Sequence, residues 1–409
     1  MPLPKVGYFS MEIAVDQSIH TYSGGLGFLA GSHMLSAGQL NLPMVGVTML
    51  WTYGYGEQRI NEKNEVEITY SPNYHSFLED TGVFVEITIF GRPVKVTAKK
   101  LRPEVFGSVP IYFLTTDVEG APEIDRVLSH KLYDSDHHIR VAQEIILGVG
   151  GYRLLQAVGE PIDIIHLNEG HALPACFEVL RQNGGNLEAL RQNCVFTTHT
   201  PVAAGNEVHP APLLAETGFF VETPFEEAVR LGGHDFSLTV AALRMSRMSN
   251  GVSQLHAHVA NRMWNWVEGR CPIIGITNAV NQKYWQDARV PEAKTDEQLL
   301  TLKKTMKQEL FDFIEETRGV KLNKDVFTIV WARRFTEYKR ADLIFRDFER
   351  IKNLLVNNKV QLIYAGKFHP KDTWGQQTYN KMLAYSKELP NLVVIPTYEL
   401  ELSAKLKQG

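Results

Sequence analysis

The sequence predicts an α/β protein with two doubly wound parallel sheets, the second of which is incomplete. Three observations lead to this prediction. Short apolar segments alternate with stretches of helical periodicity along most of the chain. Polar residues follow the apolar segments, as they do at the carboxyl edge of a parallel sheet. A charged, helix-forming stretch after Trp285 interrupts the alternation, which then restarts.

Length and composition exclude several classes of protein. The chain has 409 residues, and at roughly 150 residues per domain it is too long for one small module. A hydrophobic content of 44% and a charged content of 22% exclude wholesale disorder. The formal net charge of −4 provides no field for polyanions, so neither nucleic acid nor a membrane surface is an expected partner. The three cysteines have neither metal-ligand nor disulfide spacing. The sequence also has no leader and no apolar run of roughly 20 residues, so we expect a cytoplasmic protein.

The first predicted domain covers residues 1–290. It follows a βα rhythm and contains one alternating pair of segments that predicts a β-hairpin insertion. In chain order we expect a strand at 5–10, a glycine turn with a helix to about residue 40, a strand at 45–51, the hairpin at 83–89 and 94–99, helical structure at 138–158, and strands at 162–167 and 194–198.

Residues 291–324 are rich in charged side chains and have few apolar residues that could form a core, which predicts a linker helix. Residues 325–409 then predict a partial second domain with fewer strands than the usual five or six. Its expected elements are strands at 326–331, 360–365 and 392–395, and helices at 341–356, 374–389 and 399–405.

A glycine turn precedes the first predicted helix. Gly24 and Gly25 would let backbone N–H groups and the positive end of the helix approach an anion such as phosphate. A turn of this kind also serves simple close packing of a helix on a strand. The sequence leaves both interpretations open.

Four cations follow the strand predicted at 326–331. Arg334 and Lys339 could hold a phosphate dianion at the carboxyl edge of the sheet, where such sheets bind ligands. Arg333 and Arg340 would remain for a second phosphate or for structure. A solvated basic turn is the alternative.

Polar residues at other strand ends are typical of a sugar site, which needs donors and acceptors in fixed places. Glu169 and His171 follow one predicted strand, His199 follows the next, and Asn278 follows a third apolar run that precedes Trp285. Each residue also has a structural interpretation, as a core histidine, an Asx turn or core packing. The chain has no nucleophile elbow, Walker loop, His-Glu-x-x-His motif or recognisable carboxylate pair, which argues against hydrolases and ATPases.

Together, four motifs in this order resemble those of the α-glucan (glycogen/maltodextrin) phosphorylases, most of all the shorter bacterial members. The motifs are Tyr22-Ser23-Gly24-Gly25-Leu26-Gly27, His166-Leu167-Asn168-Glu169-Gly170-His171, Thr197-Thr198-His199-Thr200-Pro201 and Arg334-Phe335-Thr336-Glu337-Tyr338-Lys339-Arg340. The resemblance runs from Tyr8 to about Tyr398. It implies the GT-B architecture, in which two Rossmann-like domains face a cleft.

The resemblance also implies roles for individual residues and no metal. Catalytic roles fall to Arg334 and Lys339, which would bind the substrate phosphate, and to His199 at the sugar. The implied substrate-binding residues are Gly24, Gly25, Leu26, Glu169, His171 and Asn278. The implied cofactor-binding residues are Arg333, Trp285 and Tyr398, and the cofactor is pyridoxal 5′-phosphate.

The implied reaction is reversible phosphorolysis of a terminal α-1,4-glucosyl bond to α-glucose 1-phosphate, with retention. The substrates are an α-1,4-glucan and inorganic phosphate, and the resemblance implies a homodimer. In the family, the Schiff-base lysine follows the strand that here ends near Tyr398, and the chain stops at Gly409 before that segment. We therefore expect a truncated chain in which no residue is assigned as that lysine, and activity of the isolated chain is not assumed.

Two other functions stay open. A GT-B sugar-nucleotide glycosyltransferase also uses a glycine-rich loop near its N-terminus, although the motif at 334–340 argues against it. A non-catalytic glucan-binding remnant would keep Glu169 and His199 without the cofactor lysine. The residues after Asn278 also depart from the family pattern, because Ala279 stands where the family usually has glycine.

Overall fold

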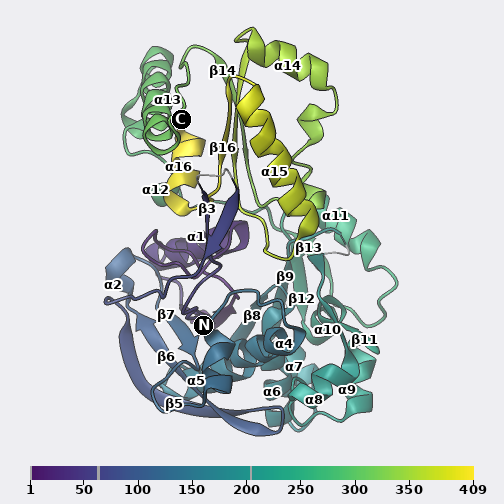
Figure 1. Cartoon of the computed structure of the whole chain (residues 1–409). Helices are drawn as coiled ribbons and strands as arrows, with labels where there is room; N and C mark the ends of the chain where they lie inside the picture. The colour runs from purple at the N-terminus through teal and green to yellow at the C-terminus, as the bar shows by residue number, and fades with distance from the viewer. Residues whose placement is uncertain (1, 62–64, 203–204) are drawn as a thin grey trace. The chain divides into compact units, whose positions relative to one another are not determined.

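The chain divides into two compact units. Unit 1 consists of Met1–Tyr55 and Pro72–Val280, and unit 2 consists of Gly56–Ser71 and Asn281–Gly409. The computed structural model describes residues 2–61, 65–202 and 205–409 (Figure 1). Within these ranges, no helix combines the length and the apolar character that crossing a membrane requires.

Unit 1 is built on a nine-stranded sheet. In spatial order its strands are β13 (Ile273–Gly275), β12 (Met248–Gly251), β9 (Cys194–Thr198), β8 (Ile164–Asn168), β1 (Val6–Phe9), β2 (Met44–Met49), β7 (Ile111–Thr115), β6 (Arg92–Leu101) and β5 (Glu79–Ile89). The strands from β13 to β7 pair in parallel, and β6 and β5 continue the sheet in antiparallel pairing. The large parallel sheet confirms the predicted α/β class, and the expected hairpin forms the β5–β6 edge of that sheet.

Helices cover this sheet, and a small antiparallel pair, β10 (Val208–Pro210) and β11 (Asp235–Ser237), lies beside them. The helical segments of unit 1 are α1 (Gly25–Gln39), α2 (Pro103–Phe106), α3 (Glu123–Arg126), η1 (Val127–Ser129), α4 (His137–Ile145), η2 (Ile146–Gly150), α5 (Gly151–Ala157), η3 (Gly170–Ala172), α6 (Pro174–Gln182), α7 (Leu187–Gln192), α8 (Ala211–Thr217), α9 (Phe225–Gly232), α10 (Leu238–Met245) and α11 (Gln254–Met263). The helix expected at 138–158 is therefore α4 and α5 joined by the π-helical turn η2.

The strand order creates a switch point between β1 and β8. From β1 the chain proceeds to β2 and β7 on one side, whereas β8, β9, β12 and β13 follow one another on the other side. The connections that leave β1 and β8 therefore run in opposite directions. In open α/β sheets, ligands bind outside the carboxyl ends of the strands at such a point.

Unit 2 contains a three-stranded parallel sheet in the order β14 (Phe327–Ala332), β15 (Val360–Ala365) and β16 (Leu392–Ile395). Its helical segments are α12 (Gln282–Trp285), η5 (Val290–Glu292), α13 (Asp296–Arg318), η6 (Glu337–Lys339), η7 (Leu343–Phe345), α14 (Phe348–Val356), α15 (Thr373–Glu388) and α16 (Leu400–Gln408). Leu362 belongs to the apolar cluster on one face of β15 and Ile363 to the cluster on the other. Both faces of the small sheet are therefore covered.

Two segments that the sequence places outside the second domain belong to unit 2. Helix α13, expected to be a linker, buries Leu310, Phe311 and Ile314 in one of the two clusters. The hairpin β3 (Glu57–Ile60) and β4 (Val66–Thr69) packs against the other cluster. Gln58 fixes this hairpin, because its side-chain amide donates to the Phe368 carbonyl (2.6 Å) and accepts from the Phe368 N–H (3.2 Å).

Helix α1 lies close to the chain segment that follows β1, and Gly31 permits this approach. A Cβ atom at Gly31 would lie 1.7 Å from the Ala14 carbonyl oxygen, which no side-chain adjustment can relieve because both atoms are backbone-fixed. A Cβ atom at Gly25, in the first turn of the same helix, would meet no described atom within 4 Å.

The contrast between these two glycines gives a stability prediction. We expect Gly31→Ala to lower the free energy of unfolding by about 3 kcal/mol, at the upper end of typical overpacking costs. Gly25→Ala, the matched control, should change it by less than about 1 kcal/mol, because alanine is the better helix former. Urea unfolding of the three proteins checks this, and equal midpoints for both variants would contradict the close packing of α1.

Candidate functional site

Side-chain hydrogen bonds join three strand ends of unit 1 at the switch point. His199 Nε2 lies 2.7 Å from Asn168 Oδ1, and Asn168 Nδ2 donates to Ser10 Oγ at 3.0 Å. Ser10 Oγ in turn donates to the Glu12 carbonyl at 2.7 Å. Because the amide nitrogen of Asn168 faces Ser10, its oxygen faces His199, and the Nε2 atom of His199 carries the proton.

His199 is a neutral imidazole in this arrangement. Burial lowers its pKa to about 3, with a smaller contribution from His256 and His171. With Nε2 donating to Asn168, Nδ1 is the nitrogen that can accept a hydrogen bond. The hydrogen-bonded series from His199 through Asn168 to Ser10, called the relay below, therefore presents His199 Nδ1 as an acceptor of fixed orientation at the end of β9.

The carboxylate of Glu12 holds the glycine turn before α1. It accepts hydrogen bonds from the Ser23 N–H (2.6 Å), the Ser23 hydroxyl (2.9 Å) and the Gly24 N–H (3.2 Å). Tyr133 donates its hydroxyl to the same carboxylate at 2.6 Å. The side chain of Glu12, a residue that is only 2% exposed, thus fixes the turn.

The glycines of this turn differ in what surrounds them. A Cβ atom at Gly27 would lie 2.6 Å from Tyr22 Cβ and 2.9 Å from Glu12 Oε2, so this glycine permits close packing. Gly25 is exposed and has open space beside it in the described part of the chain. The packing interpretation therefore accounts for Gly27, and the N–H groups near Gly25 have room for a ligand.

Glu169 has a backbone conformation that is almost restricted to glycine, with φ 64° and ψ 178°. Such strain costs about 1–3 kcal/mol and is concentrated at functional sites. The Glu169 carboxylate accepts the His199 N–H at 2.7 Å. Burial, together with the charge of Glu207, raises its pKa to about 8 despite this bond, so the carboxyl group holds a proton at neutral pH. A strained, buried acid of perturbed pKa is a functional candidate.

A pocket of about 310 Å³ lies beside α1 and the ends of β8 and β9. It includes two of the predicted residues, His199 and the exposed Asn278. The other lining residues are Tyr8, Leu29, Ser32, His33, Ser36, Ala37, Leu40, Leu42, His166, Asn168, Thr197, Asn250, Ile276, Thr277, Ala279 and Val280.

Sequence reasoning missed a second polar row in this pocket. His166 Nε2 lies 2.8 Å from Thr197 Oγ1, which donates to Asn250 Oδ1 at 2.7 Å. Burial lowers the pKa of His166 to about 3, so this histidine is also neutral. The signal was the alternation along β8, which places His166 and Asn168 on one face of the sheet.

His171 lies outside this pocket. Its Nε2 atom is 3.4 Å from Glu207 Oε2, and burial lowers its pKa to about 4. Arg140 binds the same carboxylate with two hydrogen bonds of 2.7 and 2.9 Å, which hold the pKa of Glu207 far below its usual range. His171 therefore belongs to a separate charged group of unit 1.

The predicted phosphate residues follow β14 in unit 2. The Arg333 N–H donates to the Ala365 carbonyl (3.0 Å), and the Phe335 N–H donates to the Lys367 carbonyl (2.8 Å). These bonds hold the loop after β14 beside the loop after β15. Phe335 is fully buried and anchors the loop, whereas Arg334 and Lys339 are half-buried. The cations therefore lie at the carboxyl edge of the sheet, as the sequence predicts.

The predicted cofactor residues lie along one series of contacts in unit 2. Tyr398 is close enough to Arg333 and Ser403 for both to oppose the rise in its pKa that burial causes. Lys407, on α16 like Ser403, has its Nζ atom 4.3 Å from the centre of the Trp285 ring and donates to the Ser403 carbonyl at 3.2 Å. Partial burial lowers the pKa of Lys407 to about 8. The sequence had not singled out Lys407, because one more lysine in an amphipathic helix carries no signal.

Comparison with known proteins gives relatives along almost the whole chain. No protein-family model matches. The chain is 43% identical over 98% of its length to an uncharacterised protein of Methanocaldococcus jannaschii, of which it covers 78%. It is 32% identical over 98% of its length to maltodextrin phosphorylase of Thermococcus litoralis, and 28% identical over 93% to glycogen phosphorylase of Aquifex aeolicus. It spans 56% and 65% of the lengths of these two phosphorylases.

The fold is of the α/β class, and the relatives with a named activity are glycogen and maltodextrin phosphorylases. These relatives support the phosphorylase family that the sequence motifs predict.

The raised pKa of Glu169 gives a prediction on stability and pH. Between the unfolded pKa near 4.5 and the folded pKa of about 8, the folded chain holds a proton that the unfolded chain has released. The free energy of unfolding therefore falls as pH rises in this window. From pH 6.5 to 8 we expect the difference between the wild type and Glu169→Gln to fall by about 1.5 kcal/mol. The pKa values of His166, His171 and His199 are lowered, so these residues change the free energy of unfolding mainly below this pH range.

Glu178→Gln is the matched control for this measurement. Glu178 is a buried carboxylate. Burial alone would raise its pKa, but hydrogen bonds from Arg153 and Arg181 lower the pKa to about 2. Its contribution to stability is complete above pH 6.5, so its loss should be the same at pH 6.5 and pH 8. Urea unfolding at both pH values checks both variants, and parallel profiles of the wild type and Glu169→Gln would refute the assignment.

Proposed function

We propose that this chain provides the glucan- and phosphate-binding parts of an α-1,4-glucan phosphorylase, which releases α-glucose 1-phosphate with retention. The observation that carries the proposal is the hydrogen-bonded relay from His199 through Asn168 to Ser10, next to the strained Glu169. The names of the relatives support it at the level of the family. A GT-B architecture with units 1 and 2 as its domains, a homodimer and a cytoplasmic location are parts of the same proposal.

The sugar-binding side of the proposal rests on uncharged groups in unit 1. His199 offers Nδ1 as an acceptor, and the protonated Glu169 and the amide of Asn278 offer donors and acceptors for sugar hydroxyls. Uncharged partners suit a substrate that is polar and uncharged, because burying an unpaired ion beside it would be costly. His171 would contact the glucan farther from the reacting glucosyl unit.

The phosphate-binding side rests on positive groups in both units. In unit 2 we assign the side chains of Arg334 and Lys339 to the substrate phosphate. In unit 1 we assign the N–H groups of Gly25 and Leu26 to an anion, because the N–H group of Gly24, which the resemblance also implies, is already donated to Glu12. In this mechanism the phosphate protonates the leaving glycosidic oxygen and then captures the oxocarbenium-like sugar on the same face. Preorganised positive charge is needed because phosphate groups repel strongly where water is excluded.

Pyridoxal 5′-phosphate is the cofactor that the family implies, and the donor set of unit 2 fits it. Arg333 supplies a cation for a phosphate group, and Tyr398 and Trp285 supply aromatic surfaces in the same series of contacts. When bound, the cofactor supplies a second phosphate group that supports the proton transfer. The family's Schiff-base lysine is assigned to no residue of this chain.

Activity measurement tests the proposal directly. The 409-residue chain is incubated with maltodextrin and pyridoxal 5′-phosphate, with and without inorganic phosphate, and any glucose 1-phosphate that it releases should appear only when phosphate is present. Release of glucose without phosphate would contradict it. Turnover of ADP-glucose or UDP-glucose would favour the glycosyltransferase instead, and saturable maltodextrin binding without turnover would favour a binding remnant.

The phosphate assignment gives a second prediction. Arg334→Ala should weaken the binding of inorganic phosphate by about 2 kcal/mol or more, which is about 30-fold in Kd, because a charge-assisted pair is lost. Isothermal titration calorimetry with phosphate measures this. Arg346→Ala, which removes an exposed arginine after η7, is the control and should leave the Kd unchanged. An unchanged phosphate affinity in Arg334→Ala would remove Arg334 from the site.

A further inference from the structure

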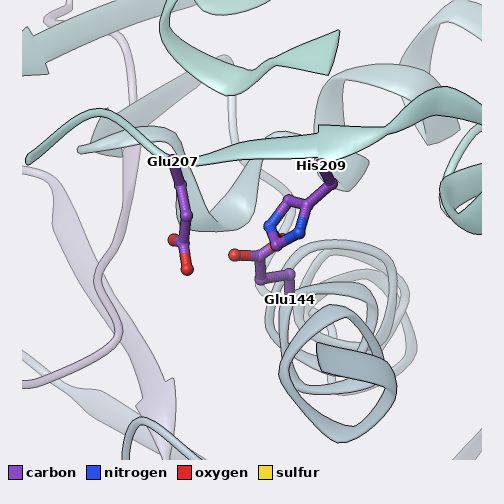
Figure 2. Close-up of side chains that lie close together, drawn as sticks. All are labelled: Glu144, Glu207 and His209. Carbon is purple, nitrogen blue, oxygen red and sulfur yellow. Dashed lines mark ion pairs between the residues drawn. The ribbon is translucent and has the colours of Figure 1, made fainter. Parts of the chain in front are cut away.

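A group of buried ionisable side chains in unit 1 lies beside Arg140 and His171, apart from the pocket described above. Glu144 on α4 and His209 on β10 are 0% and 2% exposed, and Glu207 directly precedes β10. One ligand atom from each of these three residues lies within 4.8 Å of the other two. Figure 2 shows the three side chains converging on one place from two different elements.

The hydrogen bonding of this group is incomplete. In the described residues, both carboxylate oxygens of Glu144 and both ring nitrogens of His209 lack a hydrogen-bond partner. Glu144 Oε2 and His209 Nε2 are 3.9 Å apart, which is too far for a hydrogen bond. Buried polar atoms are almost always paired, so four such atoms in two neighbouring side chains require an explanation.

We propose that Glu144, Glu207 and His209 bind one divalent transition-metal ion, for which Zn²⁺ is the probe. An imidazole with two carboxylates is a donor set for zinc and its neighbours, whereas Ca²⁺ and Mg²⁺ prefer oxygen ligands alone. With metal–ligand bonds of about 2.0–2.2 Å, two ligand atoms of a tetrahedral site lie about 3.3–3.6 Å apart. The three ligand atoms, which lie within 4.8 Å of one another, therefore have to approach each other by up to about 1.5 Å when the ion binds.

The charges and the surrounding contacts favour a cation at this place. Burial and the neighbouring Glu207 raise the pKa of Glu144 well above its ordinary value, so an ion that binds here would displace the proton of Glu144. Once Glu144 is ionised, the two carboxylates and Arg140 together carry a net charge of −1, which attracts a divalent ion. Arg140 fixes the orientation of Glu207 through its two hydrogen bonds, as outer contacts do for metal ligands. The Glu207 side chain is 29% exposed and gives the ion a path from solvent.

The ion would join α4 to the chain at β10 and would support the glycine turn indirectly. The Arg140 guanidinium lies 4.6 Å from the centre of the Tyr133 ring, and Tyr133 donates to Glu12. Arg140 thus connects the proposed metal ligands with the carboxylate that holds Ser23 and Gly24. The proposal concerns a structural ion and does not depend on the glucan phosphorylase activity.

Metal titration of the full chain tests this site. After removal of metals with a chelator, Zn²⁺ titration by calorimetry should give one ion per chain. Glu144→Gln and His209→Gln should each weaken binding more than the 10- to 100-fold that loss of an outer contact causes. His75→Gln is the matched control, because both ring nitrogens of His75 are also buried without a hydrogen-bond partner in the described residues, but the side chains that influence its pKa are those of His20 and Lys99 rather than carboxylates. It should bind Zn²⁺ as the wild type does.

A spectroscopic readout on the wild type covers the case in which the variants do not fold. Co²⁺ bound by the wild-type chain should show the d–d absorption bands of a nitrogen- and oxygen-ligated site, and Zn²⁺ should displace it and raise the Tm. Failure of the wild type to bind either ion would overturn the proposal and leave a trapped water as the partner of Glu144 and His209. Unchanged Zn²⁺ binding in both folded variants would mean an adventitious ion only, and equal binding of Ca²⁺ would overturn the choice of a transition metal.

Discussion

The buried carboxylate of Glu12 is the group through which the parts of the candidate site in unit 1 are connected. Its oxygens accept from Ser23, Gly24 and Tyr133, and its backbone carbonyl accepts from Ser10. Glu12 alone therefore fixes the start of α1 and also the hydrogen-bonded series that ends at His199. A buried carboxylate is tolerated when donors satisfy it, and here every donor also orients a segment of the site.

The electrostatic character of the two units differs in a way that suits their proposed ligands. In unit 1, burial keeps His166 and His199 uncharged and keeps Glu169 protonated at neutral pH. In unit 2, the cationic side chains of Arg334 and Lys339 are half-exposed after a strand end. The carboxyl edge of the unit 1 sheet thus carries neutral hydrogen-bonding groups, and the carboxyl edge of the unit 2 sheet carries cationic side chains. The difference arises because the side chains of unit 1 are more deeply buried.

Unit 2 also shows how a three-stranded sheet is stabilised by segments from elsewhere in the chain. Helix α13 covers one face, and the hairpin β3–β4, from the early part of the sequence, packs against the cluster on the other. Gln58 joins this hairpin to Phe368, in the loop that runs beside Phe335 and the cations that we propose for phosphate. The hairpin therefore supports the loop that carries Arg333 and Arg334.

Local patterns in the sequence predicted β1, β2, β5, β6, β8 and β9 of unit 1 and the three sheet strands of unit 2, but not β7 or β12. They also predicted the helix after the glycine turn and the cationic loop after β14, because periodicity and glycine placement depend on neighbours in the chain. Tertiary structure decided the rest. The transfer of 57–69 to unit 2, the positive φ of Glu169 and the convergence of Glu144 with His209 all depend on contacts between residues far apart in sequence. Such contacts leave no periodic signal, since burial and hydrogen-bond partners are properties of the folded chain.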